Sequence, residues 1–320
     1  MQNPFQFSQD NKRYHTYAYA LRQRYGIRVA RVPLDGGFTC PNRDGTKGVG
    51  GCTFCSGSGS GDQIEVGDLR AQYDRYREKL AGKWQNAKCM PYFQSFSGTY
   101  APVEQLQALY ERALALPDAV GLVIATRGDC VTAENAALLG ALARRTDVTV
   151  ELGLQTASDE TALRIGRAET RTEFMQGLHL LRAHGVPVWV HLMNGLPGED
   201  RLSMLDSARF VAGLDVQGVK LHALHVLRGT PLADMWCAGQ LSVLSMEDYV
   251  GVVCDQLEVL PPEFIIGRLT GDGAADALLA PDWSRRKRAV LAAIDKELVR
   301  RDSWQGKFAL RGQACTSENG

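Results

Sequence analysis

The sequence lacks the features that mark membrane proteins, secreted disulfide scaffolds and strong non-specific nucleic-acid binders. No apolar run approaches the ~18 residues that would indicate a membrane-spanning helix. The polar residues 1–17 have no apolar centre of the kind found in signal peptides. Basic and acidic side chains balance at 36 each, and the eight cysteines are mostly isolated. We therefore expect a cytoplasmic protein that associates with neither membrane nor DNA.

The chain also has no internal repeat and no linker that would divide it into separate domains. Its 320 residues suffice for one barrel, which commonly takes ~200–250 residues, together with extensions at both ends. Hydrophobic residues make up 45% and charged residues 22%, as in an ordinary globular protein.

Apolar segments rich in β-branched residues alternate with stretches of helical periodicity. The expected strands are residues 27–32, 90–96, 121–125, 148–154, 186–193 and 218–224. One helix is expected to begin after Thr170, because Glu173 completes a capping-box spacing, and to end before Gly185. A repeated strand–helix order predicts parallel strands with helices outside them.

Six such units are fewer than the eight of a closed barrel. The sequence therefore predicts the α/β class, in the form of a partial (β/α)6 TIM-like barrel of parallel strands with outer helices. We expect an N-terminal extension over residues 1–26 and a barrel core over residues 27–260. A C-terminal strand/helix extension over residues 261–320 should pack on the barrel and contain a long helix near residues 284–301. Ligands are expected at the carboxyl ends of the strands.

Three cysteines, Cys40, Cys52 and Cys55, follow the first expected strand with the spacing Cys-x11-Cys-x2-Cys. Several glycines lie between them and allow the backbone to wrap closely around an inorganic group. Thiolates bind zinc and iron–sulfur clusters. Three thiolates without an obvious fourth ligand indicate a cluster with one open coordination position. The alternatives are a zinc site closed by a remote ligand and three unrelated buried cysteines.

The cysteine loop and later segments together resemble one known family. These segments are CPNRDG, GGCTFC, YFQ, TYAP, ATR-D, ELGLQT, GLPGE, KLHALHVLRGT, RLTGD and WQGK. They resemble the radical S-adenosylmethionine (SAM) superfamily, and within it the bacterial YhcC/YtqA-type family related to the elongator catalytic subunit. The usual superfamily spacing is Cys-x3-Cys-x2-Cys, and the longer first gap here resembles the elongator branch. The resemblance extends from about Tyr17 to Phe308, nearly the whole chain.

The resemblance implies that Cys40, Cys52 and Cys55 hold a [4Fe–4S] cluster whose unique iron binds the amino and carboxylate groups of SAM. Reductive cleavage of SAM would then give methionine and a 5′-deoxyadenosyl radical that abstracts hydrogen from a substrate carbon. A reductant such as flavodoxin or ferredoxin is the expected electron donor. No second group of cysteines is present, so no auxiliary cluster is expected.

The resemblance also implies SAM contacts at the ends of the second and fourth strands. Gln94 and Ser95 are expected near the methionine amino group, chiefly through backbone atoms. Gln155 and Arg167 match residues that contact the ribose and carboxylate of SAM in coproporphyrinogen-oxidising relatives, and the arginine fork suits a carboxylate. The alternative for Arg167 is a solvated position on a helix surface.

Further SAM contacts are expected after the third and fifth strands. Thr126 and Asp129 follow the third strand, and Asp129 either accepts hydrogen bonds from the ribose or caps a helix. Asn194 and Gly195 begin the stretch NGLPGE, which resembles the adenine-contact stretch of the superfamily and also forms the turn into a helix.

The barrel interior supplies the candidate catalytic residues. Strand alternation places Lys220 and His222 on the same face of the sixth strand. His222 is either a catalytic or substrate-contacting residue or a hydrogen-bonded core residue. Glu151 faces the interior from the fourth strand, either toward the cofactor or in a structural ion pair with Lys220. Arg268, Asp272 and Trp283 either line the substrate entrance or brace the C-terminal helix.

The leading functional hypothesis is a radical SAM enzyme that acts on the side chain of a wobble uridine in tRNA, a process with which members of the family have been linked. A basic run at residues 285–288 is expected either to contact RNA or an acidic electron donor, or to form a solvated helix face. The alternative from another class is a non-catalytic zinc- or iron–sulfur-binding interaction protein.

Overall fold

A computed structural model describes residues 3–59, 64, 67–82, 84, 86–271 and 276–309. Its strands are β1 (Val29–Leu34), β2 (Lys88–Phe93), β3 (Gly121–Thr126), β4 (Asp147–Gln155), β5 (Val188–Asn194), β6 (Gly218–Ala223), β7 (Val226–Leu227), β8 (Ile265–Arg268) and β9 (Leu278–Ala280). Its α-helices are α1 (Tyr17–Tyr25), α2 (Leu69–Ala81), α3 (Val103–Leu114), α4 (Ala133–Ala143), α5 (Asp159–Arg164), α6 (Arg171–Ala183), α7 (Arg201–Ala212), α8 (Pro231–Cys237), α9 (Met246–Val259) and α10 (Lys287–Arg300). Two short 3-10 helices are η1 (Gly128–Cys130) and η2 (Asp282–Arg285). Within these residues, no helix combines the length and apolar character needed to cross a bilayer.

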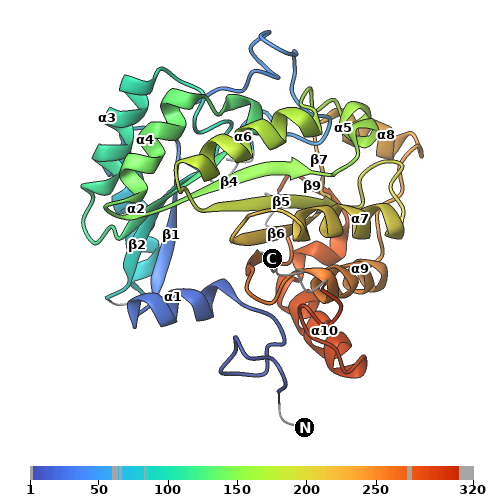
Figure 1. The fold of residues 1–320 in the computed structure, drawn as a ribbon. Coiled ribbons are helices and arrows are strands. Elements are labelled where there is room, and N and C mark those ends of the chain that lie inside the picture. The colour runs from blue at the N-terminus through green and yellow to red at the C-terminus, as the bar shows by residue number, and fades with distance from the viewer. Residues whose placement is uncertain are drawn as a thin grey trace, which may run out of the picture.

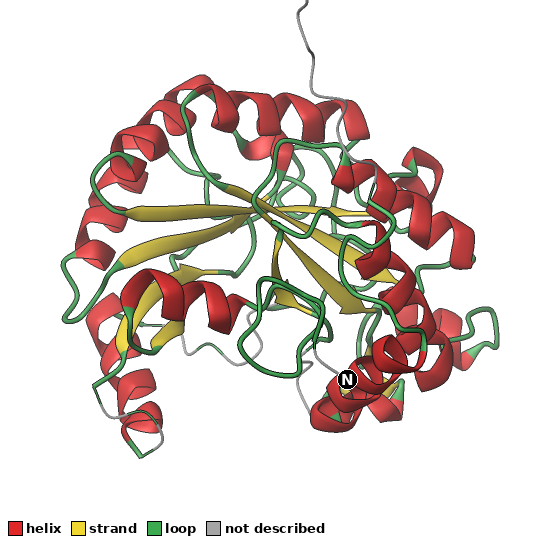
Figure 2. Cartoon of the chain, turned by 60° about the horizontal axis from the view of Figure 1, so that its bottom comes forward, coloured by secondary structure: helices red, strands yellow, loops and turns green. Residues whose placement is uncertain are grey.

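Seven parallel strands form one open, curved sheet in the order β1-β2-β3-β4-β5-β6-β8. Figure 2 shows this sheet as an arc bordered by helices. The expected α/β class and partial barrel are thereby confirmed. The C-terminal segment contributes β8 to this sheet, where Ile265 pairs with Gly218 of β6. It also contributes β9, which pairs antiparallel with β7 in a separate two-stranded sheet.

The main core lies between the sheet and its outer helices. Helix α6 illustrates how local sequence produces this packing. Thr170 caps it and Glu173 completes the capping box, as predicted. The side chains of Phe174, Leu178 and Leu181 are buried in the main hydrophobic core. The strands are largely apolar, as expected where helices cover the outer face of a parallel sheet, and a polar residue on the inner face is an exception with a structural or chemical role.

The strand boundaries differ from the prediction by up to three residues. The first strand begins at Val29 rather than at residue 27, since the β-branched Ile27 is 44% exposed and has no strand partner. The second strand ends at Phe93 rather than at residue 96, and Phe96 adopts a positive φ of 58° that an extended strand does not allow. Parallel pairing therefore decides the ends of these strands.

The N-terminal segment lies across the opening between the first and last strands of the sheet. Thr16 forms a bridge with Ile266 of β8, and α1 contacts both β1 and β8. The fully buried amide of Gln305 accepts a hydrogen bond from the backbone N–H of His15 and donates to the carbonyl of Phe264. In Figure 1, α1 and α10 accordingly lie on the same lower side of the molecule. The segment that contains α1 thus meets β8 and the segment around Gln305 at the opening of the half-barrel.

Candidate active site

The three cysteines lie in the loop that follows β1, and all three are free thiols. The guanidinium of Arg43 donates hydrogen bonds to the carbonyl oxygens of Cys55 (3.0 Å) and Ser56 (2.5 Å). Gly51 has a φ of +86°, and a Cβ atom there would lie 2.7 Å from Nε of Arg43. Glycine is therefore required where the loop folds back on Arg43.

Contacts to the segment after β4 hold this loop against the barrel. The amide of Asn42 donates to the carbonyl of Gly166 (2.7 Å), and the backbone N–H of Thr53 donates to that of Ile165 (2.9 Å). Lys47 forms an ion pair with Glu173 in the first turn of α6. The position of the cysteines thus depends on the connection between α5 and α6.

The thiols of Cys40 and Cys52 lie close enough to that of Cys55 to affect its pKa. Burial, together with the neighbouring Cys52 and Cys40, raises the pKa of Cys55 above its usual value. Metal binding would therefore displace a proton from a thiol that is otherwise protonated at neutral pH. Among the residues that the structure describes, no three His, Cys, Asp or Glu side chains surround a single ion position. A [4Fe–4S] cube places each cysteine on a different iron, so its ligands need not converge on one point. Three free thiols in one loop beside the same cavity are the kind of donor set that such a cluster takes.

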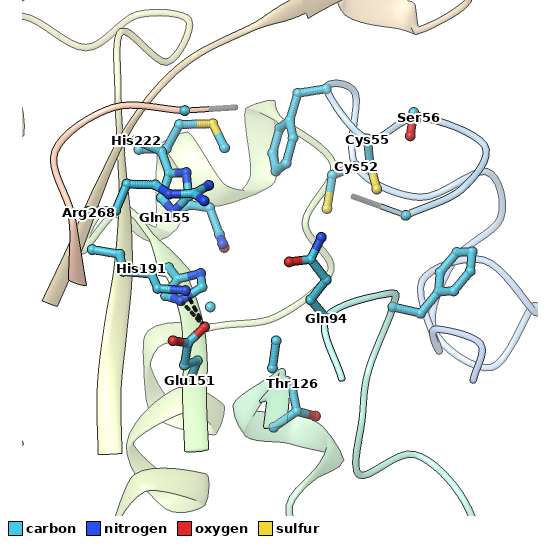
Figure 3. Close-up of a pocket in the computed structure, with 18 of the residues that line it drawn as sticks. Cys52, Cys55, Ser56, Gln94, Thr126, Glu151, Gln155, His191, His222 and Arg268 are labelled. Atoms are coloured by element: carbon cyan, nitrogen blue, oxygen red, sulfur yellow. Dashed lines mark hydrogen bonds and ion pairs between the residues drawn. The ribbon is translucent and has the colours of Figure 1, made fainter. Parts of the chain in front are cut away.

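A cavity of about 630 Å³ opens beside the cysteines within the half-barrel. Figure 3 shows Cys52 and Cys55 on one side of it and Gln155, His222 and Arg268 on the other. The predicted site residues that line it together with Cys40, Cys52 and Cys55 are Gln94, Thr126, Glu151, Gln155, Arg167, Lys220 and His222. The structure thus brings together most of the residues that the sequence singled out.

Gln155 lies at an irregular point where β4 ends. The register between β4 and β5 shifts between Gly153 and Gln155, and Gln155 has a positive φ of 66°. A Cβ atom at Gly153 would lie only 2.9 Å from Nε2 of Gln155 and 3.3 Å from Nη2 of Arg167. Within the described residues, the buried Oε1 of Gln155 has no hydrogen-bond partner. The bulge and the glycine therefore create room for an amide that is available to a ligand.

Arg167 is buried, with 5% of its surface exposed, so the solvated-helix alternative is wrong. Its guanidinium donates to the carbonyl of Gly153 and forms an ion pair with Glu169. Glu169 in turn accepts a hydrogen bond from the backbone N–H of Gly128 (2.7 Å). Arg167 therefore lines the cavity and also holds a buried carboxylate in place.

Asp129 does not line the cavity. Its carboxylate accepts two hydrogen bonds from Arg127 (2.8 and 2.7 Å) and pairs with Lys47 (2.7 Å). Burial alone would raise the pKa of Asp129, but the charges of Arg127 and Lys47 hold it below its usual value. Asp129 also lies within η1 rather than at its N-cap, which is Arg127. Its side chain is thus part of an ion-pair network, whereas Arg127, for which no role was predicted, lines the cavity beside Thr126.

The stretch NGLPGE, which begins with Asn194 at the end of β5, also lies outside the cavity lining. The amide of Asn194 exchanges two hydrogen bonds of 2.8 Å with Gln256 of α9 and is 2% exposed. Gly195 turns the chain with a φ of +91°. Contact of this stretch with adenine stays a prediction about backbone atoms, because the Asn194 side chain is engaged elsewhere. Ser95 is likewise buried outside the lining.

A buried ionic cluster crosses the interior below Gln155. Glu151 is fully buried, and its carboxylate contacts Lys220 (2.5 Å), Arg31 (2.5 Å), the hydroxyl of Tyr92 (2.6 Å) and Nε2 of His191 (3.0 Å). The ion pair with Lys220 confirms one of the two roles expected for Glu151. Sequence reasoning missed Arg31 and His191. Each is a polar residue in an otherwise apolar strand segment, and that pattern in the sequence could have identified both as candidate interior residues.

The electrostatics of this cluster follow from its burial. Burial alone would raise the pKa of Glu151, but the charges of Arg31 and Lys220 hold it well below its usual range. Burial lowers the pKa of Lys220 well below its usual value, and it lowers that of His191 to about 4. Glu151 is therefore ionised and His191 neutral at pH 7.

The remaining candidates separate into cavity and scaffold residues. His222 lines the cavity, its ring lies 5.3 Å from that of His191, and its buried Nε2 has no partner among the described residues. Arg268 also lines the cavity. The indole of Trp283 donates to the carbonyl of Leu244 (2.8 Å) and braces the C-terminal region. Asp272 lies outside the described residues.

Comparison with family models defines the class of protein. A model of the radical SAM superfamily matches residues 40–211, more than half of the chain and beginning at Cys40. A model of the radical SAM C-terminal domain matches residues 216–300. The chain belongs to the radical SAM superfamily, as its cysteine loop and strand-end segments predicted.

Individual relatives place the chain within that superfamily. Bacillus subtilis YtqA is 50% identical over 311 residues, which are 97% of each chain. The tRNA uridine(34) acetyltransferase of Dehalococcoides mccartyi is 31% identical over 157 residues, 48% of this chain and 33% of that protein. The solved structure of Elp3 from the archaeon Methanocaldococcus infernus matches with a TM-score of 0.62 at 18% identity, covering 87% of this chain and 65% of that one. The likeness to Elp3 shows the fold, and the YtqA-type family with its elongator relationship is confirmed.

Proposed function

We propose that the protein cleaves SAM reductively and uses the resulting radical to abstract hydrogen from a bound substrate. The observation that carries this proposal is the gathering of Cys40, Cys52 and Cys55 beside a cavity lined by Gln155 and Arg167. A [4Fe–4S] cluster on these thiolates, with SAM on its open iron, supplies the 5′-deoxyadenosyl radical when bound.

The chain's own residues bind, orient and shield the reactants. Arg167 presents a guanidinium suited to the SAM carboxylate, and the unpartnered amide oxygen of Gln155 can accept a hydrogen bond from a ribose hydroxyl. The enclosing walls of the half-barrel keep water and competing hydrogen donors away from a reactive radical. Of the two candidate catalytic residues, Lys220 is engaged by Glu151, whereas His222 has an unpartnered nitrogen within the described part of the chain. His222 is therefore the better candidate for substrate contact.

Anaerobic reconstitution with iron and sulfide tests this function. The reconstituted protein should show broad visible absorption and, with dithionite, convert SAM to 5′-deoxyadenosine, measured by liquid chromatography with mass detection. Cys55→Ala should abolish 5′-deoxyadenosine formation, because the cluster loses one of its three ligands. Cys237→Ala is the matched control, since Cys237 is an exposed cysteine in α8 away from the cavity lining.

Two results would contradict the proposal. One is a colourless protein that holds one equivalent of zinc and forms no 5′-deoxyadenosine, as expected of a non-catalytic metal-binding interaction protein. The other is undiminished SAM cleavage by Cys55→Ala.

We also propose that the substrate is a uridine side chain in tRNA and that flavodoxin or ferredoxin supplies the electron. The relative from Dehalococcoides mccartyi, named for action on uridine 34 of tRNA, supports this substrate class. Cys40 and Cys55 are residues of intermediate exposure, so the loop that would hold the cluster reaches the surface, where a donor could dock.

The substrate class can be tested by incubating the reduced enzyme and SAM with tRNA from a strain that lacks the gene. Nucleosides are then compared by mass before and after reaction, with Cys55→Ala as the inactive control. A new mass at uridine that requires intact Cys55 is the expected result. Unchanged tRNA, despite SAM cleavage in the same sample, would exclude this substrate.

A further inference from the structure

One lysine of the cysteine loop reaches a buried carboxylate of the barrel. Lys47 lies between Cys40 and Cys52 in the sequence. Its ammonium group pairs with Asp129 (2.7 Å) and with Glu173 at the start of α6. The side chain of Lys47 is 29% exposed, whereas that of Asp129 is only 3% exposed. The contact to Asp129 therefore connects the loop with the interior of the molecule.

Asp129 extends this connection to Arg127. The two oxygens of its carboxylate accept hydrogen bonds from Nε and Nη2 of Arg127 (2.8 and 2.7 Å), a charge-assisted bidentate pair. The same guanidinium donates to the carbonyl oxygens of Arg167 (2.8 Å) and Ala168 (3.0 Å). The contacts thus run without interruption from the cysteine loop to the backbone of Arg167, whose own guanidinium lines the cavity.

The side chain of Arg167 is held by the same short segment as its backbone. Its guanidinium pairs with Glu169, which accepts hydrogen bonds from the backbone N–H groups of Gly128 (2.7 Å) and Asp129 (3.3 Å). A Cβ atom at Gly128 would lie 2.6 Å from the Cα of Phe174, so glycine is needed where η1 packs against α6. Residues 127–129 therefore fix both the carbonyl and the guanidinium of Arg167.

Arg127 is also a neighbour of one of the three cysteines. Both Arg127 and Cys40 line the cavity. Burial alone would lower the pKa of Arg127, but Asp129 and Glu169, together with Cys40, hold it above its usual value. Arg127 is thus a fixed positive charge within electrostatic range of a proposed cluster ligand. Groups that surround metal ligands in this way orient them and affect the properties of the metal centre.

We propose that Lys47 and Asp129 are positioning residues, which fix the cysteine loop at one defined distance and orientation relative to Arg167. The inference rests on the proposed function, in which a single SAM molecule contacts both the open iron of the cluster and the guanidinium of Arg167. Two contacts to one ligand are strong only if the protein holds both partners in the right relative geometry. Lys47 therefore contributes to SAM binding although its own ammonium group is paired with carboxylates outside the cavity lining.

Lys47→Gln tests this role in anaerobically reconstituted protein. The variant should bind SAM about ten-fold more weakly than wild type, measured by calorimetry. It should also lose iron to a chelator faster, and the electron paramagnetic resonance spectrum of its reduced cluster should change less when SAM is added. Lys12→Gln is the matched control, because Lys12 pairs with Asp295, is 26% exposed and lies outside the cavity lining. This control should bind SAM and retain iron as wild type does.

Further variants identify the route by which Lys47 acts. Asp129→Asn removes the buried charge that Lys47 meets, so the double variant Lys47→Gln/Asp129→Asn should lose no more SAM affinity than Asp129→Asn alone. Glu173→Gln removes the other partner but keeps a capping-box acceptor, and it should lose less affinity than Lys47→Gln. Lys47→Arg keeps the charge and should retain most of the affinity. If Asp129→Asn does not fold, the comparison of Lys47→Gln with Glu173→Gln and Lys47→Arg decides the question.

Three outcomes would overturn the positioning role. The first is a Lys47→Gln variant with wild-type SAM affinity and spectrum, even if its stability is lower, because the ion pair would then serve the fold alone. The second is an equal loss of SAM affinity in Lys12→Gln, and the third is an equal loss in Glu173→Gln. Each of these leaves SAM binding by wild type intact. Wild-type protein that holds a cluster but binds no SAM would instead refute the proposed function, and this inference with it.

Discussion

Arg167 has a structural role in the protein, and we propose that the same side chain also binds the cofactor. The sequence spacing from Gln155 led to the expectation of a SAM contact, with a solvated surface residue as the alternative. The structure shows a buried guanidinium that holds the carboxylate of Glu169 and also lines the cavity. If Arg167 serves both roles, a substitution at this position should change two measurable quantities, the affinity for SAM and the free energy of unfolding.

Arg167→Ala should weaken SAM binding and also lower the free energy of unfolding by about 3 kcal/mol, because Glu169 loses its closest buried cation. SAM affinity is measured by calorimetry on reconstituted protein, and stability by urea denaturation. Iron content should stay at the wild-type level, since Arg167 is not a cluster ligand. Unchanged SAM affinity in a protein that is folded and loaded with iron would show that the assignment of Arg167 to the cofactor is wrong.

At the scale of elements, local sequence signals located the helices better than the ends of the strands. The capping box of α6 could be predicted because Thr170 and Glu173 interact within one turn. The start of β1 and the end of β2 could not, because they depend on which residues of the neighbouring strands are available for pairing. The N-terminus of α6 is also tied to the cysteine loop through Lys47 and Glu173.

Thr170→Ala should lower the free energy of unfolding by about 1 kcal/mol, since it removes the N-cap that accepts a hydrogen bond from the backbone N–H of Glu173. Thr172→Ala is the matched control in the same helix. Thr172 is exposed, and alanine has the higher helix propensity, so this variant should be as stable as wild type or slightly more so. Urea denaturation of the three proteins at pH 7 provides the comparison. Equal losses of stability in the two variants would argue against a specific capping effect.

At the scale of the whole molecule, the ionic cluster around Glu151 joins strands that are distant in sequence. Its members come from β1, β2, β4, β5 and β6, so it forms only when the half-barrel is complete. Burial lowers the pKa of His191 from 6.5 to about 4. Below pH 6.5 the unfolded chain therefore takes up a proton that the folded protein does not bind, and stability falls as the pH decreases toward 4.

His191→Gln should reduce this loss of stability. Between pH 7 and pH 5 the contribution of His191 amounts to about 2 kcal/mol, and the variant should lose that much less than wild type over the same interval. Glutamine retains an N–H donor for Glu151, so the cluster is preserved. Denaturation curves at pH 7, 6 and 5 measure the difference. Parallel pH profiles for the two proteins would mean that His191 titrates normally in the folded state.

The sequence by itself determined the features that depend on short spacing and on periodicity. Cys40, Cys52 and Cys55 follow the first strand in one loop, so their grouping is nearly a local property, and the alternation of strands and helices specified a parallel half-barrel. The inward direction of Glu151, Lys220 and His222 followed from strand alternation.

Only the tertiary structure decided which partner each polar side chain meets. Asp129 and Asn194 were candidates for cofactor contact, with a helix cap and a turn as the alternatives, and their side chains make long-range contacts with Lys47 and Gln256. Arg31 reaches Glu151 across the sheet although 120 residues separate them. Such contacts depend on the register and curvature of the assembled strands. A buried polar side chain needs a hydrogen-bonding or ionic partner, and the assembled geometry decides which partner lies within reach.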